Sequence, residues 1–365
     1  MYHYLFQPQK KQVYRGAITI WDTPHLSVLG SQFGYIRNAL SNIEDKHDGV
    51  GFQLTELTYS NSDEIAYNAS INKNHPDIMI HQIGSKNIST QYIMKNATLM
   101  EELNSLYTIP ALRQSSQKVS VCPFYNIYVL IINKDLFSET GVSLPSKHFT
   151  SKSFTEALNQ LHQENKTKKR FNSIDMDISK NSFPYIPFLC NAKKTDKKLL
   201  SQLISIMQQE KTLGRDSNDT YYDFIHGKTA IYAGTLQDVN RLIRQQKKDT
   251  IFSYQVMFYP YENTPTVFLQ QPVRYDILVS NNKNKNQFLK SFARYLLSRQ
   301  NQQDTEILGL LPSVEYSSIQ FKKYPYLKNF LYKEENDYYI PGTKSYEKYQ
   351  FLGEQMINAA LSKNK

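Results

Sequence analysis

The feature that most constrains the fold is an unbroken apolar run in the middle of the segment 119–137. Residues 127–132 read Ile-Tyr-Val-Leu-Ile-Ile, all of them β-branched, aromatic or aliphatic. A run without polar alternation is typical of a strand that is buried on both faces of a sheet. The next residues, Asn-Lys-Asp at 133–135, supply turn chemistry, and Leu-Phe at 136–137 can open a short helix. The segment therefore predicts a central, fully covered strand.

The N-terminal part of the chain alternates between strand and helix patterns. Strands are predicted at residues 17–21, 49–57 and 76–81, and one helical face between the first two strands is predicted at Phe33, Ile36, Leu40 and Ile43. This order is typical of an open α/β sheet, in which ligands bind beyond the carboxyl ends of the strands. Residues 21–25 and 81–82 are therefore predicted to lie at the rim of a ligand site. A chain of 365 residues is long for one domain, so two lobes are expected.

A second informative phrase runs from Phe224 to Gly234, with the sequence Phe-Ile-His-Gly-Lys-Thr-Ala-Ile-Tyr-Ala-Gly. It predicts a helix that ends near Phe224, a left-handed cap at Gly227 and a strand from residue 229. Gly234 is expected to open a loop, after which Thr235 or Asp238 caps a helix that runs to Arg244.

Three further segments are assigned by their patterns. Residues 149–209 are mostly helical in pattern, but prolines at 184 and 187 predict that Tyr185 is presented by an irregular loop. Residues 268–280 are expected to form one returning strand, and residues 286–298 a helix with a buried face. The pair Asp175 and Asp177 is expected in a solvated loop, since the other ligands of a calcium loop are missing.

Taken together, these phrases resemble the solute-binding proteins of ABC importers, in the class that is like maltose-binding protein. Residues 133–137 match the phrase that ends the crossing between lobes in this class, with Ile132 where a tyrosine is usual. The phrase 224–234 and the Gly-x-Leu-Pro turn at 309–312 also match. Sugar-binding members often carry an aromatic residue two positions after the glycine at 234, and here that position is Leu236.

The resemblance implies a two-lobed α/β fold of the type II periplasmic-binding-protein kind, each lobe a sheet flanked by helices. The expected N-terminal lobe comprises residues 14–126 and 275–312, and the expected C-terminal lobe comprises residues 127–274 and 313–365. A hinge would close the lobes around a carbohydrate or oligosaccharide, with aromatic faces and polar side chains as contacts. The ligand-binding residues predicted on this basis are Asp22, His81, Tyr125, Asn126, Tyr185, Gln237 and Arg274.

The implied partners are a small-molecule ligand and an ABC transporter permease, for a monomer at the cell surface. No apolar run is long enough to span a bilayer, and residues 1–13 lack a signal-peptide core. The chain is then either cytosolic or a mature form from which the export signal was removed; the resemblance favours an extracytoplasmic lipoprotein. Two alternatives stay open: a sensor or surface interaction module that has lost transport, and a carbohydrate-active enzyme.

Composition and motifs exclude several other classes. The net charge of +10 comes from basic clusters that are far apart in sequence, which is unlike a nucleic-acid interface. No nucleophile elbow, P-loop or dinucleotide fingerprint occurs, and the eight histidines have no metal-ligand spacing. No cofactor, metal or catalytic residue is therefore predicted. Cys122 and Cys190 lie in apolar surroundings and are expected to be buried free thiols.

Overall fold

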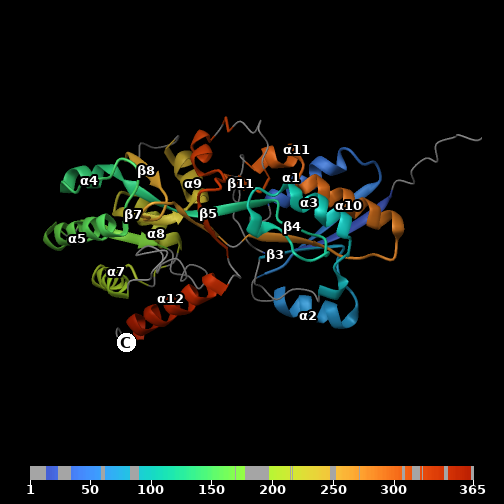
Figure 1. Ribbon diagram of the computed structural model, residues 1–365, viewed down its shortest axis with the longest axis horizontal. Coiled ribbons are helices and arrows are strands. Elements are labelled where there is room, and N and C mark those ends of the chain that lie inside the picture. Colours follow the sequence, from blue (N-terminus) through green and yellow to red (C-terminus); the bar gives the residue numbers. More distant parts are fainter. Residues whose placement is uncertain are drawn as a thin grey trace, which may run out of the picture. The chain divides into compact units, whose positions relative to one another are not determined.

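The computed structural model divides the chain into two compact units (Figure 1). Unit 1 contains Met1–Phe124, Val273–Leu308 and Pro312–Ile319; unit 2 contains Tyr125–Pro272, Gly309–Leu311 and Gln320–Lys365. The structure describes residues 14–23, 34–58, 62–82, 90–168, 170–176, 197–213, 215, 217–246, 252–270, 272–305, 309–314, 321–322, 324–340 and 344–362.

Unit 1 is built on a five-stranded sheet with the order β2-β1-β3-β10-β4. Strands β1, β2 and β3 are parallel, and β10 runs antiparallel to both β3 and β4. Its strands are β1 Gly16–Asp22, β2 Val50–Glu56, β3 Ile78–Gln82, β4 Ser120–Val121 and β10 Val273–Ile277. Its helices are α1 Gly34–Glu44, α2 Ser62–Asn72, α3 Ala97–Leu106, α10 Lys283–Leu296 and α11 Arg299–Asp304, with 3-10 turns η1 Thr90–Tyr92 and η2 Pro110–Leu112.

Helices α1 and α2 cover the sheet of unit 1, and the described part of α1 buries the predicted positions Ile36, Leu40 and Ile43, whereas Phe33 lies outside the described residues. On α1 the buried positions are Tyr35, Ile36, Ala39, Leu40 and Ile43. Helix α2 buries Ala66 and Ala69 against Met79 of β3, and Trp21 of β1 packs on the same cluster. This repeat of three and four residues is that of an amphipathic helix on a sheet.

Unit 2 is built on a seven-stranded sheet in which β5 is the central strand. The main order is β12-β9-β5-β7-β6, and β8 and β11 also pair with β5. Its strands are β5 Phe124–Asn133, β6 Asn172–Met176, β7 Thr229–Thr235, β8 Tyr254–Met257, β9 Thr266–Gln270, β11 Leu311–Pro312 and β12 Asp337–Tyr339. Its helices are α4 Lys134–Thr140, α5 Ser151–Lys168, α7 Lys197–Gln209, α8 Ser217–Ile225, α9 Leu236–Gln246 and α12 Lys344–Ser362, with the 3-10 turn η5 Pro325–Phe330.

Strand β5 is the fully covered strand that its composition predicted. All ten of its residues are buried, and Leu130 and Ile132 belong to the large core of unit 2. Asn133 then caps α4, where its side-chain oxygen accepts the backbone N–H groups of Asp135 and Leu136. At the end of α8, Gly227 has φ +70°, which confirms the predicted left-handed cap.

Three local predictions were wrong. Residues 149–209 contain a strand, β6, between helices α5 and α7, because its polar side chains find buried partners far along the chain. The returning segment 268–280 is not one strand: β9 and β10 lie in different sheets, and Pro272, which has no backbone N–H, lies between them. Gly234 opens no loop, because β7 continues to Thr235 and leads directly into α9.

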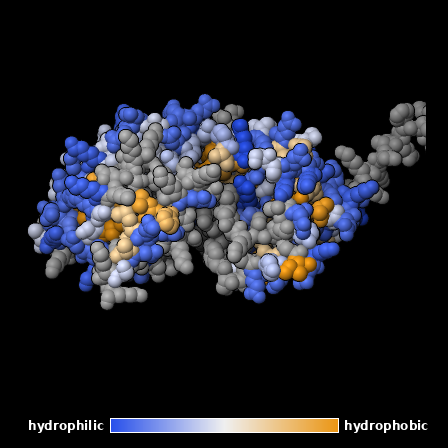
Figure 2. Space-filling model, turned by 60° about the horizontal axis from the view of Figure 1, so that its bottom comes forward, coloured by the Kyte–Doolittle hydropathy of each residue, from blue (hydrophilic) through white to orange (hydrophobic). Residues whose placement is uncertain are grey.

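The surface is mainly hydrophilic on the face turned forward in Figure 2, where hydrophobic residues form small separate areas. Scattered apolar exposure of this kind is ordinary for globular proteins. Among the described helices, none combines the length and the apolar character that crossing a bilayer requires. Cys122 is buried and free, as predicted, whereas Cys190 lies outside the described residues.

Candidate functional site

The predicted site residues of unit 1 lie at one end of the five-stranded sheet. The register places Arg274 of β10 directly across from His81 of β3, and Asp22 of β1 across from Ile80. Because side chains alternate along a strand, His81 and Arg274 share one face of the sheet and Asp22 is on the other. Asp22 and His81 are buried, and Arg274 is half-buried. Asp22 is therefore separated by the sheet from the other two.

His81 forms a buried pair with a residue that the sequence prediction missed. Its Nε2 atom lies 3.0 Å from Oδ2 of Asp276, and both side chains are at most 7% exposed. Burial by itself raises the pKa of Asp276, but the hydrogen bond and charge of His81, helped by the charge of Arg274, outweigh burial and hold this pKa below its ordinary value. His81 and Asp276 are 195 positions apart, so no local pattern could have indicated the pair.

Arg274 differs from His81 and Asp276 in its hydrogen bonding. Its Nε atom is buried, and its guanidinium forms no hydrogen bond or ion pair with any residue that the structure describes. Its charge reaches the side chains of Tyr107, Cys122 and Asp276 electrostatically. Since an arginine can donate five hydrogen bonds, this group has its full donor capacity available for another partner.

Unit 2 contains three of the other predicted residues. Tyr125 and Asn126 are buried at the start of β5, where Asn126 Nδ2 donates to Gln270 Oε1 of β9 at 2.6 Å. Burial raises the pKa of Tyr125 well above its ordinary value, so this phenol stays protonated. Gln237 is in the first turn of α9, and its buried Nε2 atom has no hydrogen-bond partner among the described residues.

The structure thus assigns six of the seven predicted residues to two sets. Asp22, His81 and Arg274 belong to unit 1, and Tyr125, Asn126 and Gln237 belong to unit 2. Tyr185 lies outside the described residues. Gln270, which holds the Asn126 amide, was also missed by the sequence prediction, and only the observed β5–β9 pairing indicates its position.

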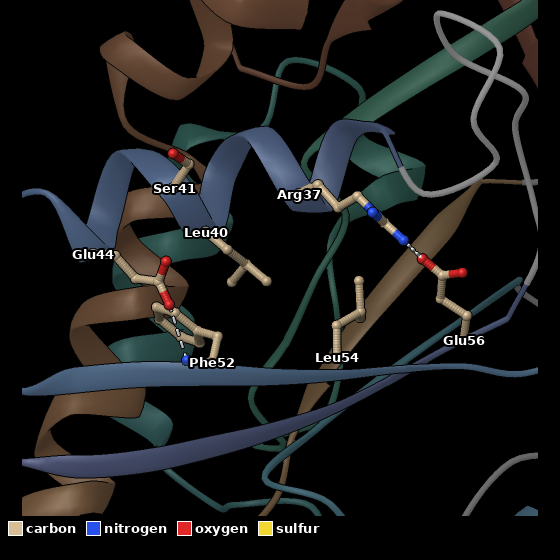
Figure 3. Close-up of a pocket in the computed structure, with 7 residues that line it drawn as sticks. All are labelled: Arg37, Leu40, Ser41, Glu44, Phe52, Leu54 and Glu56. Carbon is tan, nitrogen blue, oxygen red and sulfur yellow. Dashed lines mark hydrogen bonds and ion pairs between the residues drawn. The ribbon is translucent and has the colours of Figure 1, made fainter.

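A pocket of about 520 Å³ lies elsewhere in unit 1, between α1 and the edge strand β2 (Figure 3). It is lined by Arg37, Leu40, Ser41, Glu44, Phe52, Leu54 and Glu56. Arg37 pairs with Glu56 across one end, and Glu44 accepts the backbone N–H of Phe52 at 3.0 Å. Each charged side chain here already has a partner, so the pocket offers a ligand mainly its apolar side chains and the hydroxyl group of Ser41.

Unit 2 also contains a buried charged cluster that corrects one prediction. Asp175 lies in β6 rather than in a solvated loop, and it is fully buried. Arg215 Nη1 lies 2.9 Å from Asp175, and Arg215 Nη2 lies 2.8 Å from Asp223. Burial raises the pKa of Asp175 to about 7, although the charge of Arg215 acts in the opposite direction.

Next to this ion pair, the carboxylate of Glu210 accepts three hydrogen bonds. The backbone N–H and hydroxyl of Ser173 donate at 2.7 and 2.6 Å, and His162 Nδ1 lies at 2.7 Å. Gln209 Oε1 faces the other ring nitrogen of His162 at 3.0 Å. No group of three His, Cys, Asp or Glu side chains in the described part of the chain has an arrangement suited to a metal ion. The charged groups of this cluster therefore have their partners within unit 2.

Comparison with protein families decides the class of the molecule. The family described as bacterial extracellular solute-binding protein matches residues 38–329. This chain belongs to that family. A search of the curated proteins gave no match.

Solved solute-binding proteins have the same fold at low sequence identity. An ABC substrate-binding protein from Listeria monocytogenes, in complex with cycloalternan, is 12% identical, with 95% of this chain and 97% of that chain covered and a TM-score of 0.65. The GacH receptor of Streptomyces glaucescens, studied with acarbose, is 15% identical, with 95% and 94% covered and a TM-score of 0.66. A cyclic α-maltosyl-1,6-maltose binding protein from Arthrobacter globiformis is 13% identical, with 96% and 94% covered and a TM-score of 0.64. These solute-binding proteins confirm the expected two-lobed α/β fold class.

Proposed function

We propose that this solute-binding protein is the extracytoplasmic component of an ABC importer and that it binds a carbohydrate or oligosaccharide. The observation that carries the proposal is the family match over most of the chain, joined to a fold shared with proteins whose described ligands are saccharides. The family consists of binding proteins, and the proposed role of this chain includes no catalysis. A lipid anchor at the cell surface and a monomeric state are part of the same proposal.

The proposed mechanism is closure of two lobes on the ligand, by which the ligand shifts an equilibrium between open and closed forms. The polar contacts would come from Asp22, His81 and Arg274 in one lobe and from Tyr125, Asn126 and Gln237 in the other, with Tyr185 as a stacking ring. The amide nitrogen of Gln237 and the guanidinium of Arg274 have no hydrogen-bond partner among the described residues, and this supports the choice because buried donors normally have a partner.

One observation favours a second candidate, a sensor or surface module without transport. Leu236 is fully buried at the first position of α9, where sugar-binding members often have an exposed aromatic ring. A cleft that has lost its stacking ring at this position is expected to bind neutral sugars more weakly.

A thermal-shift screen against mono- and oligosaccharides, peptides and amino acids tests the proposal. A ligand present at 100 times its Kd adds about 2.7 kcal/mol to the unfolding free energy. A saccharide that raises the melting temperature in proportion to the logarithm of its concentration supports the proposal. Stabilisation only by peptides or amino acids, or by no solute, contradicts it.

A substitution then tests the contact at α9. Gln237→Ala removes a buried amide donor, and we expect the Kd of the saccharide found in the screen to rise about fivefold or more, as loss of about 1 kcal/mol implies. Gln163→Ala, which alters an exposed glutamine of α5, is the matched control. Equal affinity of the two variants, measured by calorimetry, would remove Gln237 from the site.

A further inference from the structure

The half-buried guanidinium of Arg274 is a cationic group of unit 1 that forms no hydrogen bond or ion pair with the residues that the structure describes. Arg274 Nε is buried and donates to no group in the described part of the chain, and no described carboxylate lies within ion-pair distance of the guanidinium. The carboxylate nearest along the strand, Asp276, directs Oδ2 at His81 instead. Leaving a buried charged donor without an acceptor costs more than leaving a neutral one, so an acceptor from outside is strongly favoured here.

Arg274 shares its face of the sheet with an aromatic residue, Trp21, which also packs on the cluster formed by Met79 and helix α2. The register runs from Trp21 through Met79 to Asp276, so Trp21 shares a face of the sheet with His81 and Arg274. Trp21 is half-buried and is the only tryptophan of the chain. Because β1 and β10 are separated by one strand and the register offsets the two residues by two positions, the Cα atoms of Trp21 and Arg274 are about 12 Å apart.

We propose that the ligand of this protein is an anionic saccharide, whose carboxylate or phosphate group binds Arg274 while the sugar lies toward Trp21. This inference rests on the saccharide-binding function proposed above. A guanidinium forms two parallel hydrogen bonds with a planar carboxylate or with two phosphate oxygens, and such charge-assisted bonds are about twice as strong as bonds to neutral hydroxyl groups.

Two other cationic side chains of unit 1 are poorer candidates for this role. Arg37, at the pocket of Figure 3, is bound to Glu56, and Lys285 donates to Asp77 at 2.7 Å. A ligand anion would have to displace a protein carboxylate at either position. Arg274 requires no such exchange, which is why the preference for an anion is assigned to it.

Matched ligand pairs that differ in charge test the proposal. Trigalacturonate is compared with its methyl ester, and glucose 6-phosphate with glucose, by calorimetry and by the emission of Trp21. We expect at least one acid to bind ten times or more tightly than its neutral form and to change the tryptophan emission. Rising salt should weaken the acid alone, since salt screens charge pairs. The two pairs distinguish a carboxylate from a phosphate as the bound group.

Two variants of Arg274 and one control variant assign the preference to Arg274. Arg274→Met should abolish the preference for the acid, Arg274→Lys should retain part of it, and Arg37→Met, with the same loss of charge, should leave it unchanged. Equal binding of acid and neutral forms by the native protein would overturn the inference, as would an Arg274→Met variant that weakens both forms equally. Binding of neutral maltotriose alone refutes the anionic ligand and preserves the proposed function, whereas binding of no saccharide refutes both.

Discussion

In unit 2, the buried carboxylate of Glu210 accepts three hydrogen bonds from its own lobe, whereas in unit 1 the guanidinium of Arg274 donates to none of the described residues. Glu210 is itself the carboxylate of a pair with His162, and Arg274 lies beside the pair of His81 and Asp276. Around Glu210 each described donor has an acceptor. Around Arg274 the donors of the guanidinium have no acceptor among the described residues.

This difference separates a structural cluster from a binding surface. A matched network such as Glu210, His162 and Ser173 fixes the positions of α5, α7 and β6, because removal of any member leaves a buried group unpaired. An unmatched donor such as Arg274 contributes little to the fold and has its hydrogen-bonding capacity left for a ligand. The unfolding free energy tests this comparison: it should fall strongly when Glu210 is replaced and should hardly change when Arg274 is replaced.

The largest effect is expected for Glu210→Ala. The substitution leaves the His162 ring and both donors of Ser173 without their acceptor in a buried site, and such a loss costs about 3–5 kcal/mol. Urea unfolding followed by far-ultraviolet circular dichroism measures it. The emission of Trp21 reports unit 1 in the same samples, so an unchanged tryptophan transition assigns the loss to unit 2.

Glu139→Ala, on the exposed side of α4, provides the control for Glu210→Ala. It removes the same side chain from a solvated position and should alter the unfolding free energy by less than about 0.5 kcal/mol. If Glu210→Ala were as mild as this control, the network would not be the structural element inferred from its hydrogen bonds.

A somewhat smaller effect is expected from the titration of Asp175. Its pKa in the folded protein, about 7, is above the ordinary value of an aspartate, about 3.9. The folded state therefore favours the neutral acid, and this contribution to stability is complete below about pH 4 and is lost as the pH rises to 7. Each pH unit between the two values is worth about 1.4 kcal/mol.

Asp175→Asn, which remains neutral at every pH, should remove this dependence. We expect the difference in unfolding free energy between the variant and the native protein to move in favour of the variant by a few kcal/mol between pH 4 and pH 7. Urea titrations at four pH values in this range measure it. Parallel curves for the two proteins would show that Arg215 and Asp223 hold Asp175 in one protonation state throughout.

The sequence predicted those parts of the fold whose cause is local. The apolar run of β5, the face of α1 and the glycine cap after α8 follow from periodicity and backbone preference, and each is observed. The family phrases predicted the two-lobed class in the same way, because they are short and contiguous.

The parts that the sequence could not predict depend on distant partners. Strand β6 carries the polar residues Ser173 and Asp175 at buried positions. In the sequence alone this pattern resembles a polar loop, because their partners Glu210 and Arg215 are distant along the chain. The pair of His81 and Asp276 likewise exists only after β10 has returned to the sheet beside β3. The surroundings of the candidate site residues also depend on distant partners, which is why the sequence could not predict the hydrogen-bond partners of these residues.

The smallest effect, and the one that most directly tests the comparison, is expected for Arg274→Met. Methionine preserves much of the length and the apolar stem of arginine and removes a charge that forms no hydrogen bond or ion pair with the described residues, so the desolvation cost of that charge disappears with it. The unfolding free energy of unit 1, followed by the emission of Trp21, should therefore change by less than about 1 kcal/mol or increase slightly. A loss of 3 kcal/mol or more would mean that Arg274 contributes as much to the stability of the fold as Glu210 does. The proposed difference between the two clusters would then be wrong. An unchanged stability combined with a lost preference for anionic saccharides is the outcome expected of a residue that serves the ligand rather than the fold.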